Sequence, residues 1–245
     1  MTSATRAVAA LSALAALLLA TGCTAAPGST APTSSPRSTP NEQVGGDGTD
    51  DSDDLEGAIL DDGRMFAVVT WGSSSCVPAV EEVAAEGQKV RVTLMDAATD
   101  QVCTADFAPR ASIGALPEGV DPTQDVTLEV AYGDISDDVD LDGDAANSGA
   151  PGSSTEYLPS AGWVDDGLLV LLTWGSSGCP PIVESVEGSG DAGTATFATD
   201  DDRMCTMDMA PRATLLSFDD EAVSDDAFTL TLVGGGLDGT VTVRG

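Results

Sequence analysis

The chain has 245 residues, 41 of them acidic and 9 basic, and its formal net charge at pH 7 is −32. A chain this acidic repels the phosphate backbone, so we expect no nucleic-acid partner. Histidine is absent, which excludes Ser-His-Asp and Cys-His catalysis as well as imidazole metal sites. Carboxylate chemistry and oxygen-ligand metals remain.

The first 22 residues have the pattern of a lipoprotein signal peptide. Arg6 precedes an apolar stretch at residues 7–20, which is shorter than the roughly 20 residues that a membrane-spanning helix needs. The Ala-Thr-Gly-Cys sequence at 20–23 resembles the lipobox of bacterial lipoproteins, with Ala20 where leucine is usual. We therefore predict that Cys23 is lipidated and holds the chain on the extracytoplasmic face of the cell membrane. The alternative is an ordinary secretory signal with Cys23 as a stray thiol.

Residues 23–55 comprise this cysteine and a segment rich in Ser, Thr, Pro, Gly and Asp. A segment with so little to bury cannot offset the entropy lost on ordering. We predict a disordered linker that acts as an extended tether between the membrane and the folded part of the chain.

Beyond the tether the sequence repeats itself. Residues 70–76, TWGSSSC, return as residues 173–179, TWGSSGC. Residues 103–110, CTADFAPR, return as residues 205–212, CTMDMAPR. The order and spacing of the motifs are kept, which indicates an internal duplication and two tandem domains rather than a solenoid. The domains are expected at 56–133 and 157–245, joined by an acidic linker at 134–156.

Both copies have the patterns of short β-strands. Apolar runs at 66–71 and 168–174 predict buried strands. Alternation with period two predicts further strands at 90–94, 126–130, 194–197, 228–233 and 240–243. Residues 79–85 fit either a strand or a short helix. Five or so strands per copy predict an all-β fold of two tandem small sandwich- or barrel-like domains, each with one disulfide, behind a disordered N-terminal tether.

Four cysteines remain once Cys23 carries the lipid: Cys76, Cys103, Cys179 and Cys205. Four cysteines allow three pairings, and the repeat favours a pair within each copy, Cys76 with Cys103 and Cys179 with Cys205. Export to an oxidising compartment predicts that both disulfides form. Each would close a loop of about 27 residues, worth roughly 3 to 4 kcal/mol in the loop-entropy model.

Six residues that recur in the two copies are candidate binding residues: Trp71, Asp106, Arg110, Trp174, Asp208 and Arg212. The tryptophans could form stacking platforms for a sugar or a peptide, but we favour aromatic side chains packed on the disulfides. Each aspartate and arginine could act as an acid and an anion grip, but we favour a structural ion pair or a capped turn. A serine-nucleophile elbow is rejected because a cysteine replaces its last glycine and no base exists.

The expected linker contains a weak calcium candidate. Asp138, Asp140 and Asp142 fit the first half of a D-x-D-x-D-G calcium loop. The twelfth position of that loop should be an acidic residue and is Gly149 here. We therefore expect no metal site, and the sequence predicts no cofactor.

The pairing of W-G-S-S-S-C with a later C-T-x-D-x-A-P-R behind a lipobox resembles uncharacterised secreted lipoproteins of actinobacteria. The resemblance implies a location and a domain type but no activity. The sequence favours a non-enzymatic, membrane-anchored module that binds an unknown envelope ligand or protein, or serves an envelope-structural role. The alternative is a carboxylate-dependent enzyme of the cell envelope, such as a glycan hydrolase, although no pair of carboxylates stands out.

Overall fold

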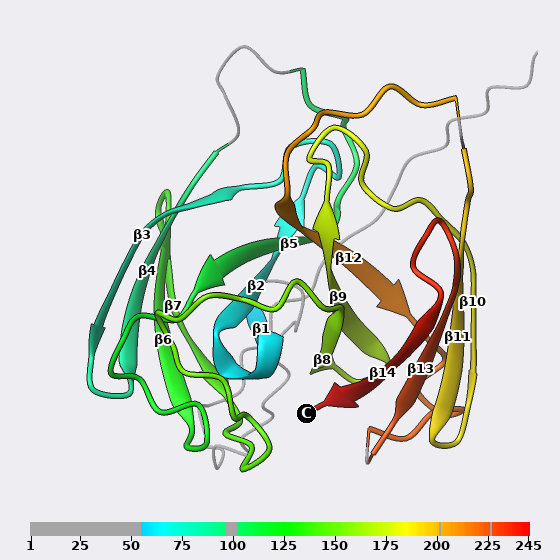
Figure 1. The fold of residues 1–245 in the computed structure, drawn as a ribbon. Coiled ribbons are helices and arrows are strands. Elements are labelled where there is room, and N and C mark those ends of the chain that lie inside the picture. Colours follow the sequence, from blue (N-terminus) through cyan, green and yellow to red (C-terminus); the bar gives the residue numbers. More distant parts are fainter. Residues whose placement is uncertain (1–54, 97–101, 201, 226) are drawn as a thin grey trace, which may run out of the picture. The chain divides into compact units, whose positions relative to one another are not determined.

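The computed structural model describes residues 55–96, 102–200, 202–225 and 227–245 (Figure 1). The predicted signal peptide, Cys23 and the tether up to residue 54 lie outside the described residues. All described residues belong to one compact unit, Gly48–Gly245. In this part of the chain no helix is long and apolar enough to cross a membrane.

The described residues form an all-β fold, as predicted, in which each copy contributes seven strands. Copy 1 contains β1 (Glu56–Leu60), β2 (Met65–Gly72), β3 (Ala79–Glu86), β4 (Lys89–Met95), β5 (Ala108–Ala115), β6 (Val126–Tyr132) and β7 (Ile135–Leu141). Copy 2 contains β8 (Ser160–Asp165), β9 (Leu168–Gly175), β10 (Val183–Ser189), β11 (Ala192–Phe197), β12 (Ala210–Ser217), β13 (Thr229–Gly234) and β14 (Gly239–Arg244). The expected number of five or so strands per copy was too low.

Within each copy the strands pair in the same order. Copy 1 has a sheet β1-β2-β5 and a sheet β3-β4-β6-β7, in which β4 and β6 are parallel. Copy 2 has the corresponding arrangements β8-β9-β12 and β10-β11-β13-β14. There a short parallel pairing of β14 with β8 joins the two into one seven-stranded sheet. The ambiguous segment 79–85 is part of strand β3.

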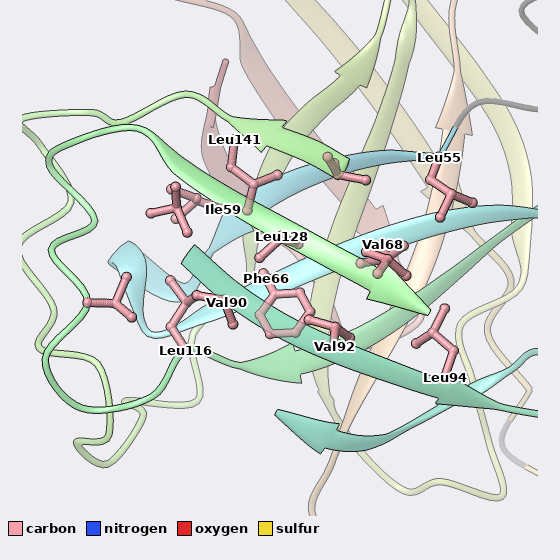
Figure 2. Packing of buried hydrophobic residues seen from close by; sticks show 14 residues of the cluster. Leu55, Ile59, Phe66, Val68, Val90, Val92, Leu94, Leu116, Leu128 and Leu141 are labelled. Atoms are coloured by element: carbon pink, nitrogen blue, oxygen red, sulfur yellow. The ribbon is translucent and has the colours of Figure 1, made fainter. Parts of the chain in front are cut away.

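Each copy has its own hydrophobic core between its two groups of strands. In copy 1, Phe66 and Val68 of β2 pack against buried side chains such as Val92 of β4 and Leu128 of β6 (Figure 2). Copy 2 builds an equivalent core around Phe228 and neighbouring leucines of β9 and β13. The alternation of strands β4 and β6 places every second residue in this core.

A third core lies between the copies. Alternate residues of β2, Ala67 and Val69, point away from the first core and pack with Val170 and Leu172 of β9. Strands β1 and β8, and strands β5 and β12, also lie against each other. The central strands β2 and β9 are therefore buried on both faces, which is why their apolar runs are continuous rather than alternating.

Strand β7 corrects the expectation of a linker over 134–156. The first part of this range is β7, a regular strand that pairs with β6 and buries Val139 and Leu141. The aspartates Asp138 and Asp140 alternate with these residues and are exposed. The sequence pattern was obscured because acidic side chains fill the solvent-facing positions of an edge strand.

Candidate functional site

The predicted disulfides are present in both copies. Cys76 pairs with Cys103, and Cys179 pairs with Cys205, with Cα–Cα distances of 5.5 and 5.4 Å. Each bridge ties the turn after a central strand, β2 or β9, to the segment that leads into β5 or β12. The pairing deduced from the repeat is therefore confirmed.

The two motif arginines hold the backbone of these turns. Arg110 donates to the carbonyl oxygens of Cys76 at 2.7 Å and Trp71 at 3.2 Å. Arg212 donates in the same way to Cys179 at 3.0 Å and Trp174 at 2.9 Å. Arg110 is buried, and burial lowers the pKa of Arg212. Guanidinium groups engaged in this way support the loop and are poorly placed to grip a ligand anion.

A glycine makes room for each guanidinium. A Cβ atom on Gly72 would lie 2.7 Å from Cζ of Arg110, and one on Gly175 would lie 2.8 Å from Cζ of Arg212. Both distances are shorter than van der Waals contact. A side chain in place of this glycine would therefore push the guanidinium away from the carbonyl groups that it bonds.

The motif aspartates bind the serine turns rather than the arginines. Asp106 accepts a hydrogen bond from the backbone N–H of Ser74 at 3.2 Å, and Asp208 accepts one from Ser177 at 3.2 Å. Each aspartate also accepts the hydroxyl of the threonine two residues before it. The described ion pairs do not include an aspartate–arginine pair of either motif.

These hydrogen bonds favour the charged form of both carboxyls. Bonds from Ser74 and Thr104 lower the pKa of Asp106 to about 2. Bonds from Thr206 and Ser177 lower the pKa of Asp208 to about 2. A carboxylate held in this state cannot serve as a general acid near neutral pH.

The motif tryptophans have different neighbours in the two copies. Trp71 is half-buried and stacks on the exposed ring of Phe107, with ring centroids 5.8 Å apart. Trp174 packs against the core between the copies and meets the edge of Tyr157 at 5.2 Å. None of the six motif residues lines the acidic cleft described below.

The weak calcium candidate does not form a loop. Asp138 and Asp140 lie on strand β7, and Asp140 accepts a hydrogen bond from Thr127 at 2.9 Å. An extended strand cannot wrap its carboxylates around one cation as a calcium loop does. Among the described residues no group of three or more His, Cys, Asp or Glu side chains could hold a metal ion.

The structure reveals an acidic cleft of about 590 Å³ between the copies. Copy 1 contributes residues from β1 and from the end of β7, and copy 2 contributes the β8–β9 turn, the segment 220–225 and the end of β14, which Figure 1 marks as C. Nine of its 19 lining residues are acidic: Glu56, Asp140, Asp142, Asp144, Asp165, Asp166, Asp220, Glu221 and Asp225. In the whole chain the acidic residues are 41 of 245, so the cleft is enriched beyond the composition.

Arg244 is the single basic residue among those that line this cleft. Its guanidinium pairs with Asp62 at 2.9 Å and with Asp144 at 3.4 Å. Strand β14 of copy 2 is thereby connected to a carboxylate of the β1–β2 turn and to one that follows β7. The guanidinium is engaged at the wall of the cleft and neutralises only part of the charge there.

Two buried side chains of the cleft wall each have one polar atom without a partner among the described residues. Asn147 is 3 % exposed and Trp163 is 9 % exposed, and both line the cleft. Asn147 donates to the carbonyl oxygen of Pro122 at 3.0 Å. Within the described residues, Oδ1 of Asn147 and Nε1 of Trp163 have no hydrogen-bond partner. A buried polar atom without a partner is costly, Oδ1 of Asn147 as an acceptor and Nε1 of Trp163 as a donor.

The sequence alone did not identify this cleft. Its acidic residues come from four separate segments, and the chain is acidic throughout. The doublet Asp165-Asp166 and the run 219–221 were visible, but nothing in the sequence placed them opposite strand β7. No protein-family model, no curated protein and no solved structure matches the chain.

Proposed function

We propose that the protein is a membrane-anchored extracytoplasmic lipoprotein that binds a small organic polycation, without catalysis, in the acidic cleft between its copies. The observation that carries this proposal is the set of nine carboxylates in one cleft, beside the acceptor Oδ1 of Asn147, which has no partner among the described residues. The ligand is a molecule with two or more amino or guanidino groups, such as a polyamine.

The spread of the carboxylates favours such a ligand over a metal ion. A divalent cation needs several oxygen ligands at about 2.3 to 2.6 Å from one point. The described carboxylates form no such group. A polyamine carries its charges several bonds apart and can meet carboxylates on both walls. The volume of about 590 Å³ lies within the usual range for small-molecule sites, about 300 to 1,000 Å³.

Two side chains of the cleft wall, Asn147 and Trp163, fit the same chemistry. Oδ1 of Asn147 is an acceptor, and an ammonium or guanidinium group offers the N–H donor that it lacks. Trp163 presents an aromatic ring at the cleft, which attracts a cation through its quadrupole.

A binding role also agrees better with the carboxylates than an acid-base enzyme does. Glycan hydrolysis needs a carboxyl with a raised pKa opposite a second carboxylate. Burial raises the pKa of Asp61, but Asp61 does not line the acidic cleft. The motif carboxyls Asp106 and Asp208 are shifted in the opposite direction.

The binding proposal can be tested by titrating the purified protein with spermidine in a calorimeter, at low and at high NaCl. We expect one saturable site whose affinity falls as salt screens the carboxylates. The double variant Asp142→Asn/Asp166→Asn removes one charge from each wall and should weaken binding roughly 2- to 30-fold, at about 0.2 to 1 kcal/mol per partly exposed ion pair.

The matched control is Glu81→Gln/Glu82→Gln on strand β3. This variant changes the net charge equally, and its residues are exposed and lie outside the cleft. It should bind spermidine like the parent protein. Equal weakening in both variants would show unspecific attraction to an acidic protein, and absence of binding in the parent would end the proposal.

The location has its own test. The two disulfides support an oxidising, extracytoplasmic compartment. Cys23→Ser should release the protein from the membrane fraction, because the acyl chains are the proposed anchor. Unchanged retention of the variant in the membrane fraction would contradict lipidation at this residue.

A further inference from the structure

The disulfide loop of copy 2 displays three methionines to solvent. Met204, Met207 and Met209 are 97 %, 103 % and 62 % exposed. They are three of the six methionines of the chain and lie within six consecutive residues. Apolar side chains of this size normally contribute to a core. These three belong to none of the cores of the described residues.

The residues between these methionines hold the backbone of the segment in place. Cys205 is bound in the disulfide, Thr206 lies 2.7 Å from the hydroxyl of Ser176, and Asp208 accepts the N–H of Ser177 at 3.2 Å. The polar residues between the methionines therefore attach the segment to the serine turn. The thioethers are left as the groups that the loop presents to solvent.

The spacing allows two or three thioethers to reach one ion. Residues two positions apart have Cα atoms at most about 7 Å apart, which applies to Met207 and Met209. Met204 is three positions from Met207. Each methionine is unbranched and has three rotatable bonds, so its sulfur can move several ångströms without moving the backbone. Two or three sulfur atoms can thus converge on one point.

We propose that Met204, Met207 and Met209 form a thioether site for a soft monovalent metal ion, Cu(I) or Ag(I). Neutral thioether sulfur selects soft ions, whereas the carboxylates of the chain select hard ions such as Ca²⁺. Cys205 offers no thiolate ligand to this ion, because its sulfur is bound in the disulfide. The site is separate from the acidic cleft and does not depend on its ligand.

Copy 1 provides an internal comparison. Its disulfide loop keeps Cys103, Thr104 and Asp106 with the same bonding partners. The residues at the three methionine positions are Val102, Ala105 and Phe107, which cannot bind a metal. The methionines are therefore not required to build the loop, and the repeated framework tolerates other side chains there.

The test uses the purified full-length protein under anaerobic conditions, with Cu(I) supplied as its complex with bicinchoninate. We expect the protein to remove one equivalent of Cu(I) from the chelator. The variant Met204→Val/Met207→Ala/Met209→Phe carries the residues of copy 1 and should remove none. The converse variant Val102→Met/Ala105→Met/Phe107→Met should remove two equivalents.

Circular dichroism shows whether each variant keeps its fold, and a second readout locates the ion. Added Ag(I) should shift the methyl NMR signals of Met204, Met207 and Met209 but not those of Met65 and Met95. Ca²⁺ should shift none of the five. The proposal is overturned if the parent protein takes no Cu(I), or if the copy 1 residues in the loop leave its uptake unchanged.

Discussion

In both copies an arginine lies against a glycine at the end of a central strand and bonds the same two backbone carbonyls. An aspartate caps the serine turn, and a disulfide closes the loop. The side chains displayed by the two loops differ, with Phe107 in copy 1 where Met209 stands in copy 2. The two copies thus share the loop framework. The exposed side chains on that framework differ, so each loop presents a different surface for binding.

A second pair of equivalent segments has diverged in conformation as well. Asp61-Asp62-Gly63 of copy 1 and Asp165-Asp166-Gly167 of copy 2 have the same sequence. In copy 1 both aspartates have positive φ, 50° and 54°, and Asp61 is buried with its N–H bound to Ser160 at 2.8 Å. In copy 2 both aspartates are exposed and only the glycine has positive φ. The two turns also differ in length, with four residues between β1 and β2 and two between β8 and β9, so the shared Asp-Asp-Gly sequence does not fix one conformation.

The largest effect is expected from removing a disulfide. Cys76→Ser/Cys103→Ser and Cys179→Ser/Cys205→Ser should each lower the free energy of unfolding by about 2 to 5 kcal/mol. The losses should be similar, because the cysteines are separated by 27 and 26 residues. Guanidinium denaturation of the two variants measures both. A large inequality would mean that the two loops do not have equivalent structural roles.

A smaller loss of stability is expected when the space between each motif arginine and its glycine is filled. Gly72→Ala and Gly175→Ala place a methyl group against a guanidinium that is held by two carbonyls, which should cost roughly 1 to 3 kcal/mol in each copy. Gly239→Ala is the control, because its Cβ would come no closer than 3.8 Å to another group. If all three variants unfold at the same denaturant concentration as the parent, the arginine is not fixed over the glycine.

The divergent turns predict a difference in pH dependence. Burial raises the pKa of Asp61 above its ordinary value of 3.8. The stability associated with the protonated carboxyl is therefore complete below pH 3.8 and is lost as the pH rises through the folded-state pKa. Asp61→Asn should remove this loss and be more stable than the parent at neutral pH.

Thermal unfolding of Asp61→Asn, Asp165→Asn and the parent between pH 3 and 7 measures this difference. The exposed Asp165 serves as the control, and its variant should follow the parent. An Asp61→Asn protein that loses stability with rising pH as steeply as the parent would contradict the proposed effect of burial.

The smallest effects concern the capping aspartates, which are fully exposed. Their pKa is about 2 in the folded protein, so their contribution to stability is present above pH 3.8 and is lost as the pH falls toward about 2. Asp106→Asn and Asp208→Asn should flatten the acid side of the stability profile by equal small amounts. Unequal profiles would indicate that one of the two turns is held differently.

Much of the fold within each copy could be predicted from the sequence. The duplicated motifs predicted the disulfide pairing, and the continuous apolar runs of β2 and β9 predicted buried strands. Local periodicity was sufficient for strands such as β4 and β6, because every second side chain enters the core of the same copy. It failed for β7, where aspartates occupy the alternate positions of an edge strand.

The contact between the copies and the cleft beside it were decided only by the tertiary structure. An apolar run such as that of β2 predicts a buried strand, but not that Ala67 and Val69 meet Val170 of the other copy. The cleft lies beside that contact and brings together Asp140 of β7 and Asp166, which is more than twenty residues further along the chain. The hydrophobic effect is non-directional, so an apolar strand does not specify which other strand will cover it. The cleft lies between the copies that this contact joins and therefore could not be predicted from the sequence.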